Sequence, residues 1–202
     1  LGWFVSDVKG GYKEVTHTGG LLGTVTQFTM IPELKLGIIV LTNQMNGLAF
    51  RSITNTIKDS YLGYNDRNWV DRYGKSNQNW LAKNDSIKNV VFEQTKLMKN
   101  NISTSNITGT YNDAWFGNFK ITKNGNDYKI ESAHSITLKG KLLPYNATTY
   151  VAKWNNRSYD ADVFVQFTFD ENNNAQSATM KYIAPITDFS FDFGDLQLNR
   201  VK

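Results

Sequence analysis

The 202-residue sequence contains no cysteine, only three prolines and only two histidines. The lack of cysteine excludes disulfides, thiolate metal sites and a cysteine nucleophile. No run of about eighteen apolar residues occurs, so the sequence predicts no membrane-spanning helix. The opening Leu1-Gly2-Trp3 lacks the charged and apolar regions of a signal peptide, which leaves the compartment open. Apolar residues make up 40% of the chain, enough for packed cores in one or two domains.

The formal net charge of +4 raises the question of a nucleic-acid partner. The lysines stand singly among asparagines and serines and never form a run. A clustered, phosphate-neutralising patch, which nucleic-acid binding requires, is therefore not evident. We expect a solvated basic surface and no nucleic-acid partner.

The residues with the clearest chemical meaning lie near the start of the chain. A β-branched run enters the polar step His17-Thr18-Gly19-Gly20, and strand-like segments follow at residues 25–30 and 36–41. The two glycines leave the backbone with little side-chain cover, so a substrate carbonyl can approach it closely. This pattern indicates an oxyanion site.

The order of elements around this step resembles the end of the catalytic domain in serine hydrolases related to class C β-lactamases and DD-peptidases. A strand at Gly2-Trp3-Phe4 precedes it, and a helical stripe from Gly47 to Leu62, with Gly63 as a stop signal, comes after it. In that family the third catalytic motif is Lys-Thr-Gly or His-x-Gly, and here the triplet reads His17-Thr18-Gly19. The resemblance covers about the first sixty-three residues.

The resemblance implies a role for each residue of the step. His17 would orient the substrate or assist a Ser-Lys-Tyr proton shuttle, and Thr18 would bind a substrate carboxylate or carbonyl. Gly19 would permit close approach, and the backbone N–H of Gly20 would be one oxyanion-hole donor. Three of these residues also have a structural alternative. His17 could be a strand histidine bonded to backbone, and Gly19 and Gly20 could form a β-bulge, although a bulge is also compatible with an active site. Histidine in place of lysine favours a peptidase or esterase over a strict β-lactamase.

Two asparagines follow the strand-like segment at residues 36–41. Some relatives place a contact to the substrate carboxylate where Asn43 and Asn46 stand, so Asn43 is the candidate for that contact. Asparagines after a strand are more often turn formers, which is the alternative.

The other two motifs of the family are not found. The only Ser-x-x-Lys, Ser6-Asp7-Val8-Lys9, runs into Gly10-Gly11 and is predicted to form a hairpin turn, so Ser6 is not the expected nucleophile. No Tyr-x-Asn occurs. We therefore interpret the chain as the C-terminal part of a larger hydrolase, whose N-terminal part is its expected partner and whose substrate is a β-lactam, a D-amino-acid peptide or an ester.

The predicted fold class is α+β, with antiparallel strands and a helix from the end of a β-lactamase-like domain at 1–63, a helical linker at 64–105 and an all-β barrel at 106–202. The linker carries one or two amphipathic helices over residues 69–99 and a polar stretch at 100–106. The barrel resembles the lipocalin-like β-domain often appended to these hydrolases. Its strands are predicted at residues 109–111, 117–121, 127–130, 136–138, 149–152, 164–169, 178–182 and 188–193.

The barrel sequence contains many aromatic residues, which either fill a core or line a ligand cavity. We favour the core, because side chains can simply fill an eight-stranded barrel. His134 has no second histidine or carboxylate at ligand spacing, so no metal site is expected, and no cofactor is implied.

The sequence leaves two functions open. The first is an enzyme fragment, which alone would be inactive and which the resemblance places in the periplasm or outside the cell. The second is a non-catalytic module whose barrel binds a ligand or partner. In either case the half-sheet of residues 1–43 would expose an apolar face, which favours self-association.

Overall fold

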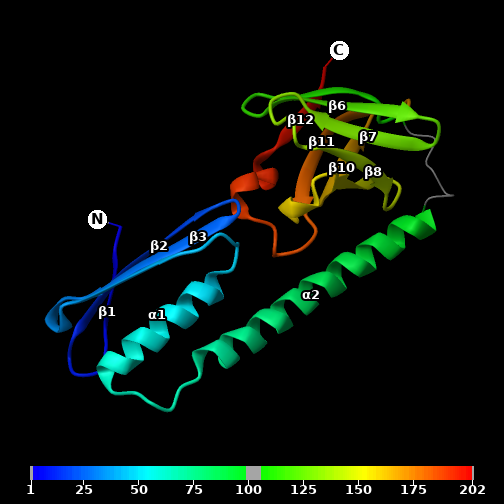
Figure 1. Ribbon diagram of the computed structural model, residues 1–202. Helices are drawn as coiled ribbons and strands as arrows, with labels where there is room; N and C mark the ends of the chain where they lie inside the picture. Colours follow the sequence, from blue (N-terminus) through cyan, green and yellow to red (C-terminus); the bar gives the residue numbers. More distant parts are fainter. Residues whose placement is uncertain (1, 99–105, 202) are drawn as a thin grey trace. The chain divides into compact units, whose positions relative to one another are not determined.

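The computed structural model describes residues 2–98 and 106–201 and divides into two compact units, residues 1–81 and 82–202 (Figure 1). The polar stretch predicted at residues 100–106 lies outside the described residues except for Asn106. The first unit contains a sheet with helical cover on one face, and the second is a barrel. The predicted α+β class is confirmed.

The sheet of the first unit has four antiparallel strands in the order β1-β2-β3-β4. Their bounds are Phe4–Asp7, Lys13–Leu21, Thr24–Ile31 and Leu36–Leu41. The turn between β1 and β2 is closed by the Val8 N–H, which donates to the Tyr12 carbonyl at 3.0 Å. The predicted hairpin is confirmed, but Ser6 and Asp7 belong to β1, opposite Glu14 and Lys13, and not to the turn.

Helix α1, Gly47–Leu62, covers one face of this sheet. The Asn46 side chain accepts the Leu48 N–H at 3.0 Å and caps the helix start, while Gly63 ends it in the left-handed conformation with φ 69°. Both predicted ends are confirmed. Phe50 packs between helix and sheet with Ile38 and Val40.

An ion pair joins the same helix to the sheet. The Lys58 ammonium lies 2.6 Å from the Glu14 carboxylate, and the two side chains are 17% and 11% exposed. A pair so poorly solvated is costly to break, because either group alone would be left as a buried charge. It therefore helps to fix which face of the sheet α1 covers.

Helix α2, Trp69–Met98, is a single helix where the sequence allowed one or two. In the first unit its start is tied to α1, since the Trp69 indole donates to Asp59 at 2.6 Å and Asn55 donates to the Tyr73 hydroxyl at 3.0 Å. In the second unit Val91 packs with Val151 and neighbouring apolar residues. Among residues 2–98 and 106–201, neither helix combines the length and apolar character needed to span a membrane.

The second unit is a closed barrel of eight antiparallel strands, as predicted. The strand order is β10-β11-β12-β5-β6-β7-β8-β9, so every strand has a partner on both sides. The bounds are β5 Gly109–Asp113, β6 Gly117–Asn124, β7 Asp127–Ser132, β8 Lys139–Pro144, β9 Thr149–Trp154, β10 Val163–Phe169, β11 Ala175–Tyr182 and β12 Gln197–Arg200.

Two of the predicted strands are wrong. Residues 136–138 precede β8 instead of forming it, and Gly140 is the reason that the true strand was missed. A Cβ at Gly140 would lie 2.1 Å from the Lys153 carbonyl oxygen, so this glycine permits close strand approach and does not mark a turn. Residues 189–195 form two 3-10 turns, because Asp192 adopts a left-handed φ of 50° that breaks the extended alternation.

The barrel interior is filled by aromatic and aliphatic side chains, as favoured from the sequence. Trp154 is 1% exposed and its indole donates to the Ala161 carbonyl at 2.8 Å. Arg200 lies among backbone oxygens of several segments and donates to the Ala175 carbonyl at 2.8 Å. The buried aromatics of this core are Tyr111, Phe119, Tyr128, Tyr150, Trp154, Phe167 and Phe193.

Burial raises the pKa of Tyr111 and of Tyr150 to about 12, and for Tyr111 this outweighs the opposing effect of Arg200. A phenol with a raised pKa in the folded state holds its proton above the unfolded pKa of about 10. The stability that these phenols contribute is therefore complete below pH about 10 and is lost as the pH rises to about 12.

Ultraviolet titration should show two late-ionising tyrosines, and Tyr150→Phe should remove one of them. Ionisation of every tyrosine near pH 10 in the folded protein would contradict this.

Candidate functional site

The candidate site lies on the half of β2 that β1 does not pair. The β1 ladder runs from Asp7 opposite Lys13 to Phe4 opposite Thr16 and stops there. On the other side β3 pairs the whole of β2 up to Leu21. Within the described residues, His17 to Leu21 therefore have a strand neighbour on one side alone, so one backbone edge of the motif is free.

The glycines of the motif do not form a bulge. The β2–β3 register is continuous from Val15 opposite Met30 to Leu21 opposite Thr24. The β-bulge interpretation is therefore wrong, and the motif is regular extended strand. Regular alternation places His17 and Gly19 on one face of the sheet and Thr18 and Gly20 on the other.

His17 is exposed and lies among aromatic rings. Its ring centroid is 5.9 Å from that of Trp3, in an edge arrangement, and 6.0 Å from that of Phe4, nearly parallel to it. Within the part of the chain that the structure describes, the imidazole has no hydrogen-bond partner. The alternative of a histidine bonded to backbone therefore finds no support, and both ring nitrogens are free for a ligand.

The two glycines differ in what surrounds them. A Cβ at Gly19 would lie 2.8 Å from the Thr26 hydroxyl oxygen, whereas a Cβ at Gly20 would meet nothing closer than Val25 Cγ1 at 3.8 Å. Packing within the sheet thus accounts for Gly19. It does not account for Gly20, where an alanine would fit.

Asn43 and Asn46 have separate positions. Asn46 is the cap of α1, so the turn-forming interpretation holds for it. Asn43 is exposed and follows Thr42, whose N–H donates to the Val25 carbonyl at 3.1 Å. Because Val25 is opposite Gly20, Asn43 lies at the same end of the sheet as Gly20, two strands or roughly 10 Å away.

Thr42 was not singled out from the sequence. Its hydroxyl donates to the Val25 carbonyl at 2.7 Å, and this bond extends the β3–β4 pairing by one residue. A threonine directly after an apolar strand gives no signal of that contact, because the contact depends on the register of β3 and β4.

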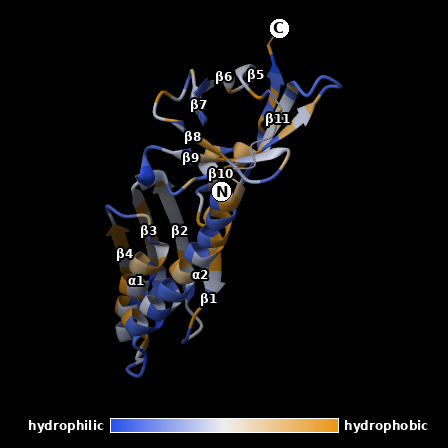
Figure 2. Ribbon diagram, turned by 90° about the vertical axis from the view of Figure 1, so that its right-hand side faces the viewer, coloured by the Kyte–Doolittle hydropathy of each residue, from blue (hydrophilic) through white to orange (hydrophobic). Residues whose placement is uncertain are grey.

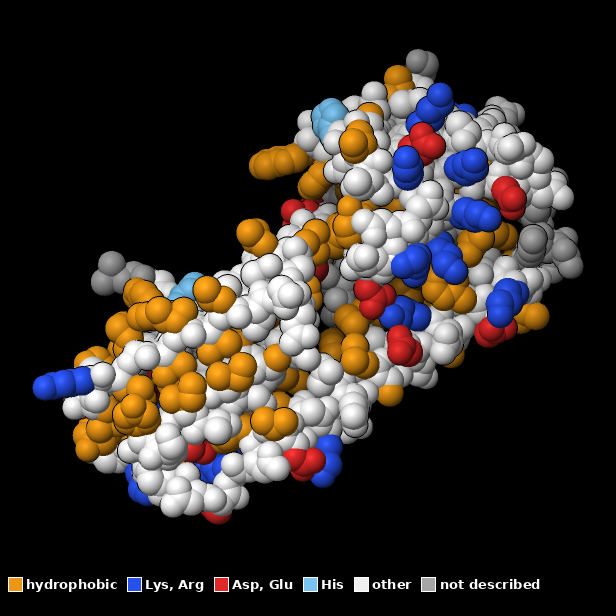
Figure 3. Space-filling view, in the orientation of Figure 1, with side chains coloured by type: hydrophobic (Ala, Val, Ile, Leu, Met, Phe, Trp, Pro, Cys, Tyr) orange, Lys and Arg blue, Asp and Glu red, His pale blue; other side chains and the backbone are white. Residues whose placement is uncertain are grey.

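The sheet face that carries His17 is apolar and open. It lies opposite the face covered by α1, and Ile39 and Leu41 on it are 65% and 75% exposed. Figure 2 shows the strands and α1 coloured by hydropathy, and Figure 3 shows hydrophobic side chains gathered over this unit. Val5, Phe28, Met30, Ile39 and Leu41 share this face by their register.

The described residues contain no group of three or more histidine, cysteine, aspartate or glutamate side chains placed to hold a metal ion. His134 lies close against Gly117, since a Cβ there would be 2.6 Å from the His134 Cε1 atom. Its ring therefore packs on the β6 backbone.

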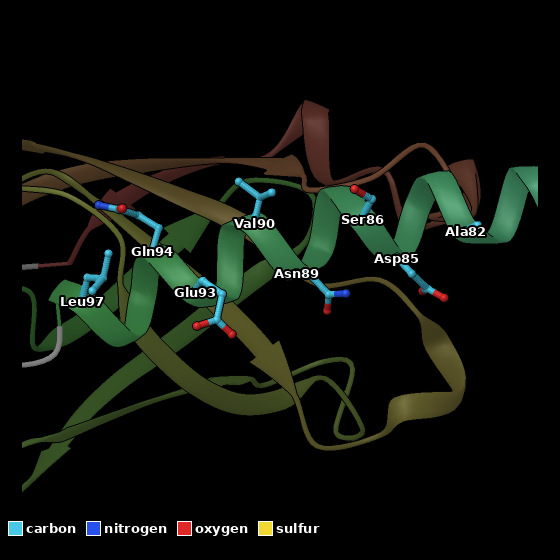
Figure 4. Close-up of a pocket in the computed structure, with 8 residues that line it drawn as sticks. All are labelled: Ala82, Asp85, Ser86, Asn89, Val90, Glu93, Gln94 and Leu97. Carbon is cyan, nitrogen blue, oxygen red and sulfur yellow. The ribbon is translucent and has the colours of Figure 1, made fainter.

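A shallow hollow of about 570 Å³ runs along α2 (Figure 4). All of its lining residues come from this one helix, and in the view of Figure 4 Asp85, Asn89 and Glu93 point to one side while Val90 points to the other. Side chains that diverge in this way do not converge on a ligand, so the hollow is a helix surface.

The contrast between the glycines can be tested by alanine substitution. We expect Gly19→Ala to lower the free energy of unfolding by about 1 kcal/mol or more, because the added methyl displaces the Thr26 hydroxyl. Gly20→Ala should be neutral or stabilising by up to about 1 kcal/mol, because it restricts the unfolded chain. Urea unfolding measures both. The loss at Gly19 should vanish in a Thr26→Ala background, and equal losses at both glycines would contradict this account.

Comparison with solved structures gives matches of low similarity. The chain is 12% identical to SurE in a crystal structure, with a TM-score of 0.35, and the match covers all of this chain and 37% of that one. A structure of SurE with D-Leu gives 12% identity, a TM-score of 0.34 and 38% coverage of that chain. The octameric penicillin-binding protein homologue from Pyrococcus abyssi gives 15% identity and a TM-score of 0.29, over 89% of this chain and 34% of that one. The chain thus spans little more than a third of the structures it matches.

No curated protein matches the sequence. A family model described as "Domain of unknown function (DUF3471)" matches residues 100–200, which is half of the chain and includes all eight barrel strands. The chain therefore belongs to the DUF3471 family.

Proposed function

We propose that this chain forms one wall of the active site of a serine acyl-transfer hydrolase that acts on a β-lactam, a D-amino-acid peptide or an ester. The observation that carries the proposal is the free edge of β2 at His17-Thr18-Gly19-Gly20. An extended strand with one free edge presents backbone N–H and C=O groups to a substrate. Here that edge coincides with the triplet that resembles the third motif of the family.

The residues of the motif have distinct roles in this proposal. The Gly20 N–H stabilises the developing oxyanion, and an N–H at the nucleophilic serine provides the second donor. His17 holds the substrate or relays a proton, with both nitrogens free to do so. Thr18 binds a substrate carbonyl or carboxylate, and Asn43 binds a carboxylate at the far end of the substrate.

The nucleophile in this proposal belongs to a further part of the same protein. Ser6 is a poor candidate, because it lies in β1 opposite Glu14 and shortly before the turn glycines. The open face around Ile39 and Leu41 is the surface that this further part would cover. Without it, the same face favours self-association. By resemblance, the whole enzyme works in the periplasm or outside the cell.

The chain alone should not be acylated. Incubation with a penicillin and with an activated phosphonate ester should leave its intact mass unchanged, because one oxyanion donor without an activated nucleophilic serine is not a catalyst. A stoichiometric adduct on Ser6 would mean that the chain is itself a nucleophilic enzyme and would overturn this part of the proposal.

The oxyanion role of Gly20 is tested in the full gene product by a matched pair of variants. Gly20→Pro removes the N–H and should slow phosphonate labelling by about 10²-fold or more, the usual loss for one oxyanion donor. Gly20→Ala keeps the N–H and fits the strand, so its rate should stay within a few-fold of the parent. A thermal melt of Gly20→Pro separates lost chemistry from lost folding. Equal labelling of both folded variants would rule out the role.

A further inference from the structure

A cavity of about 580 Å³ lies on the barrel unit, between the β5–β6 turn and the segment that leads into β12. Its volume is within the range of small-molecule sites. The motif on β2 contributes no residue to it, so ligand binding here does not depend on the proposed hydrolase activity. The lining residues are Asp113, Ala114, Trp115, Phe116, Asp192, Asp195, Gln197 and Asn199.

One of the residues that line this cavity, Trp115, has a solvent-exposed indole. Trp115 is 86% exposed, and its ring centroid lies 6.5 Å from that of Phe116. An indole exposed to this extent leaves its flat π face available to a ligand beside the cavity.

The turn that presents Trp115 is fixed by Asp113. One carboxylate oxygen of Asp113 accepts the N–H groups of Trp115 and Phe116 at 2.8 and 2.9 Å, and the other accepts the Gln197 N–H at 2.8 Å. Burial alone would raise the pKa of Asp113, but these three hydrogen bonds outweigh it and lower the pKa. The carboxylate is thus ionised at neutral pH, and the exposed indole belongs to a well-bonded turn.

The two remaining carboxylates are held at the surface by a buried neighbour. Phe193, between them, is 1% exposed and stacks on Trp154 and on Phe191, with centroid distances of 6.0 and 5.3 Å. Asp192 and Asp195 flank this anchor in the sequence and are exposed. Neither has an ion-pair partner within residues 2–98 and 106–201.

The charge of the cavity lining is opposite in sign to the net charge of its unit. Residues 82–202 contain 14 basic and 12 acidic side chains, a net charge of +2, while the cavity is lined by three carboxylates and no lysine or arginine. A local negative field beside an exposed indole suits an organic cation, which gains from both the carboxylates and the ring face. The carboxylates do not form a metal-binding group within the described residues, which argues against a bare metal ion.

We infer that this cavity binds a small ligand through an ammonium group, with the Trp115 ring face on one side of the cation and the carboxylates of Asp192 and Asp195 on the other. Asp113 positions the turn and adds to the negative field. Gln197 and Asn199 supply amide groups for hydrogen bonds to the rest of the ligand.

The test compares choline with 3,3-dimethyl-1-butanol, its neutral isostere. Titration of the protein, followed by the NMR signal of the Trp115 indole N–H, should give saturable binding of choline with a Kd on the order of millimolar. The neutral isostere should bind at least about tenfold more weakly. Added salt should weaken choline binding, because the exposed carboxylates are screened.

Variants assign the binding to the cavity. Trp115→Ala, followed by isothermal titration because it removes the NMR probe, should weaken choline binding by about tenfold, and Trp115→Phe by less. Asp195→Asn should weaken it several-fold, whereas Asp127→Asn, an exposed carboxylate at the start of β7, should leave it unchanged. Because these side chains are exposed, thermal melting should show that each variant remains folded.

Three results would overturn the inference. The first is no saturable choline binding up to about 0.1 M. The second is equal binding of choline and the neutral isostere, which would indicate a site for uncharged ligands such as sugars. The third is equal weakening of choline binding by Asp195→Asn and Asp127→Asn, which would show that the effect comes from the net charge of the protein and not from the cavity.

Discussion

The unequal lengths of β1 and β2 set the character of the sheet unit. β2 spans nine residues and β1 spans four, so β1 can pair less than half of its neighbour. The part of β2 that β1 leaves without a partner on that side contains His17, Thr18, Gly19 and Gly20, while β3 pairs them on the other side. The Glu14–Lys58 ion pair lies in the part of β2 that pairs with β1, and it holds α1 against the sheet face opposite His17. One end of β2 thus serves to hold the unit together, and the other end leaves backbone groups free.

The features that the sequence predicted well are those with local causes. Asn46 and Gly63 act within one turn of the helix that they delimit, so both ends of α1 follow from neighbouring residues. Alternation in segments such as residues 164–169 is equally local, because it reflects one strand with a buried and an exposed side. The prediction misplaced β8, where Gly140 lies against the carbonyl of Lys153. It also misplaced β12, because the preceding segment is held in 3-10 turns with Phe193 stacked on Trp154. Those contacts join residues that are distant in the sequence.

The same distinction applies to the sites. The composition of the step at His17 made it a candidate site, but the free edge beside it depends on where β1 stops. The sequence cannot distinguish Gly19 from Gly20. In the structure the Thr26 hydroxyl leaves no room for a side chain at Gly19, whereas packing does not require a glycine at position 20. The barrel cavity was missed because Asp113 and Trp115 are about eighty residues from Asp192 and Asp195. An aromatic pair in a short Asp-Ala-Trp-Phe-Gly turn was the only signal available.

The outer position of β4 has a consequence for how the protein must be made. β4 ends the strand order of its sheet, and its sequence Leu36–Leu41 contains no charged residue and no proline. Short apolar strands of this kind are templates for intermolecular pairing when their backbone groups are free. The nearest polar residues on either side of the strand are Lys35 in the preceding turn and Thr42 directly after it. Synthesis exposes this segment before the barrel exists, so chaperone binding at residues 36–41 would protect the nascent chain from aggregation.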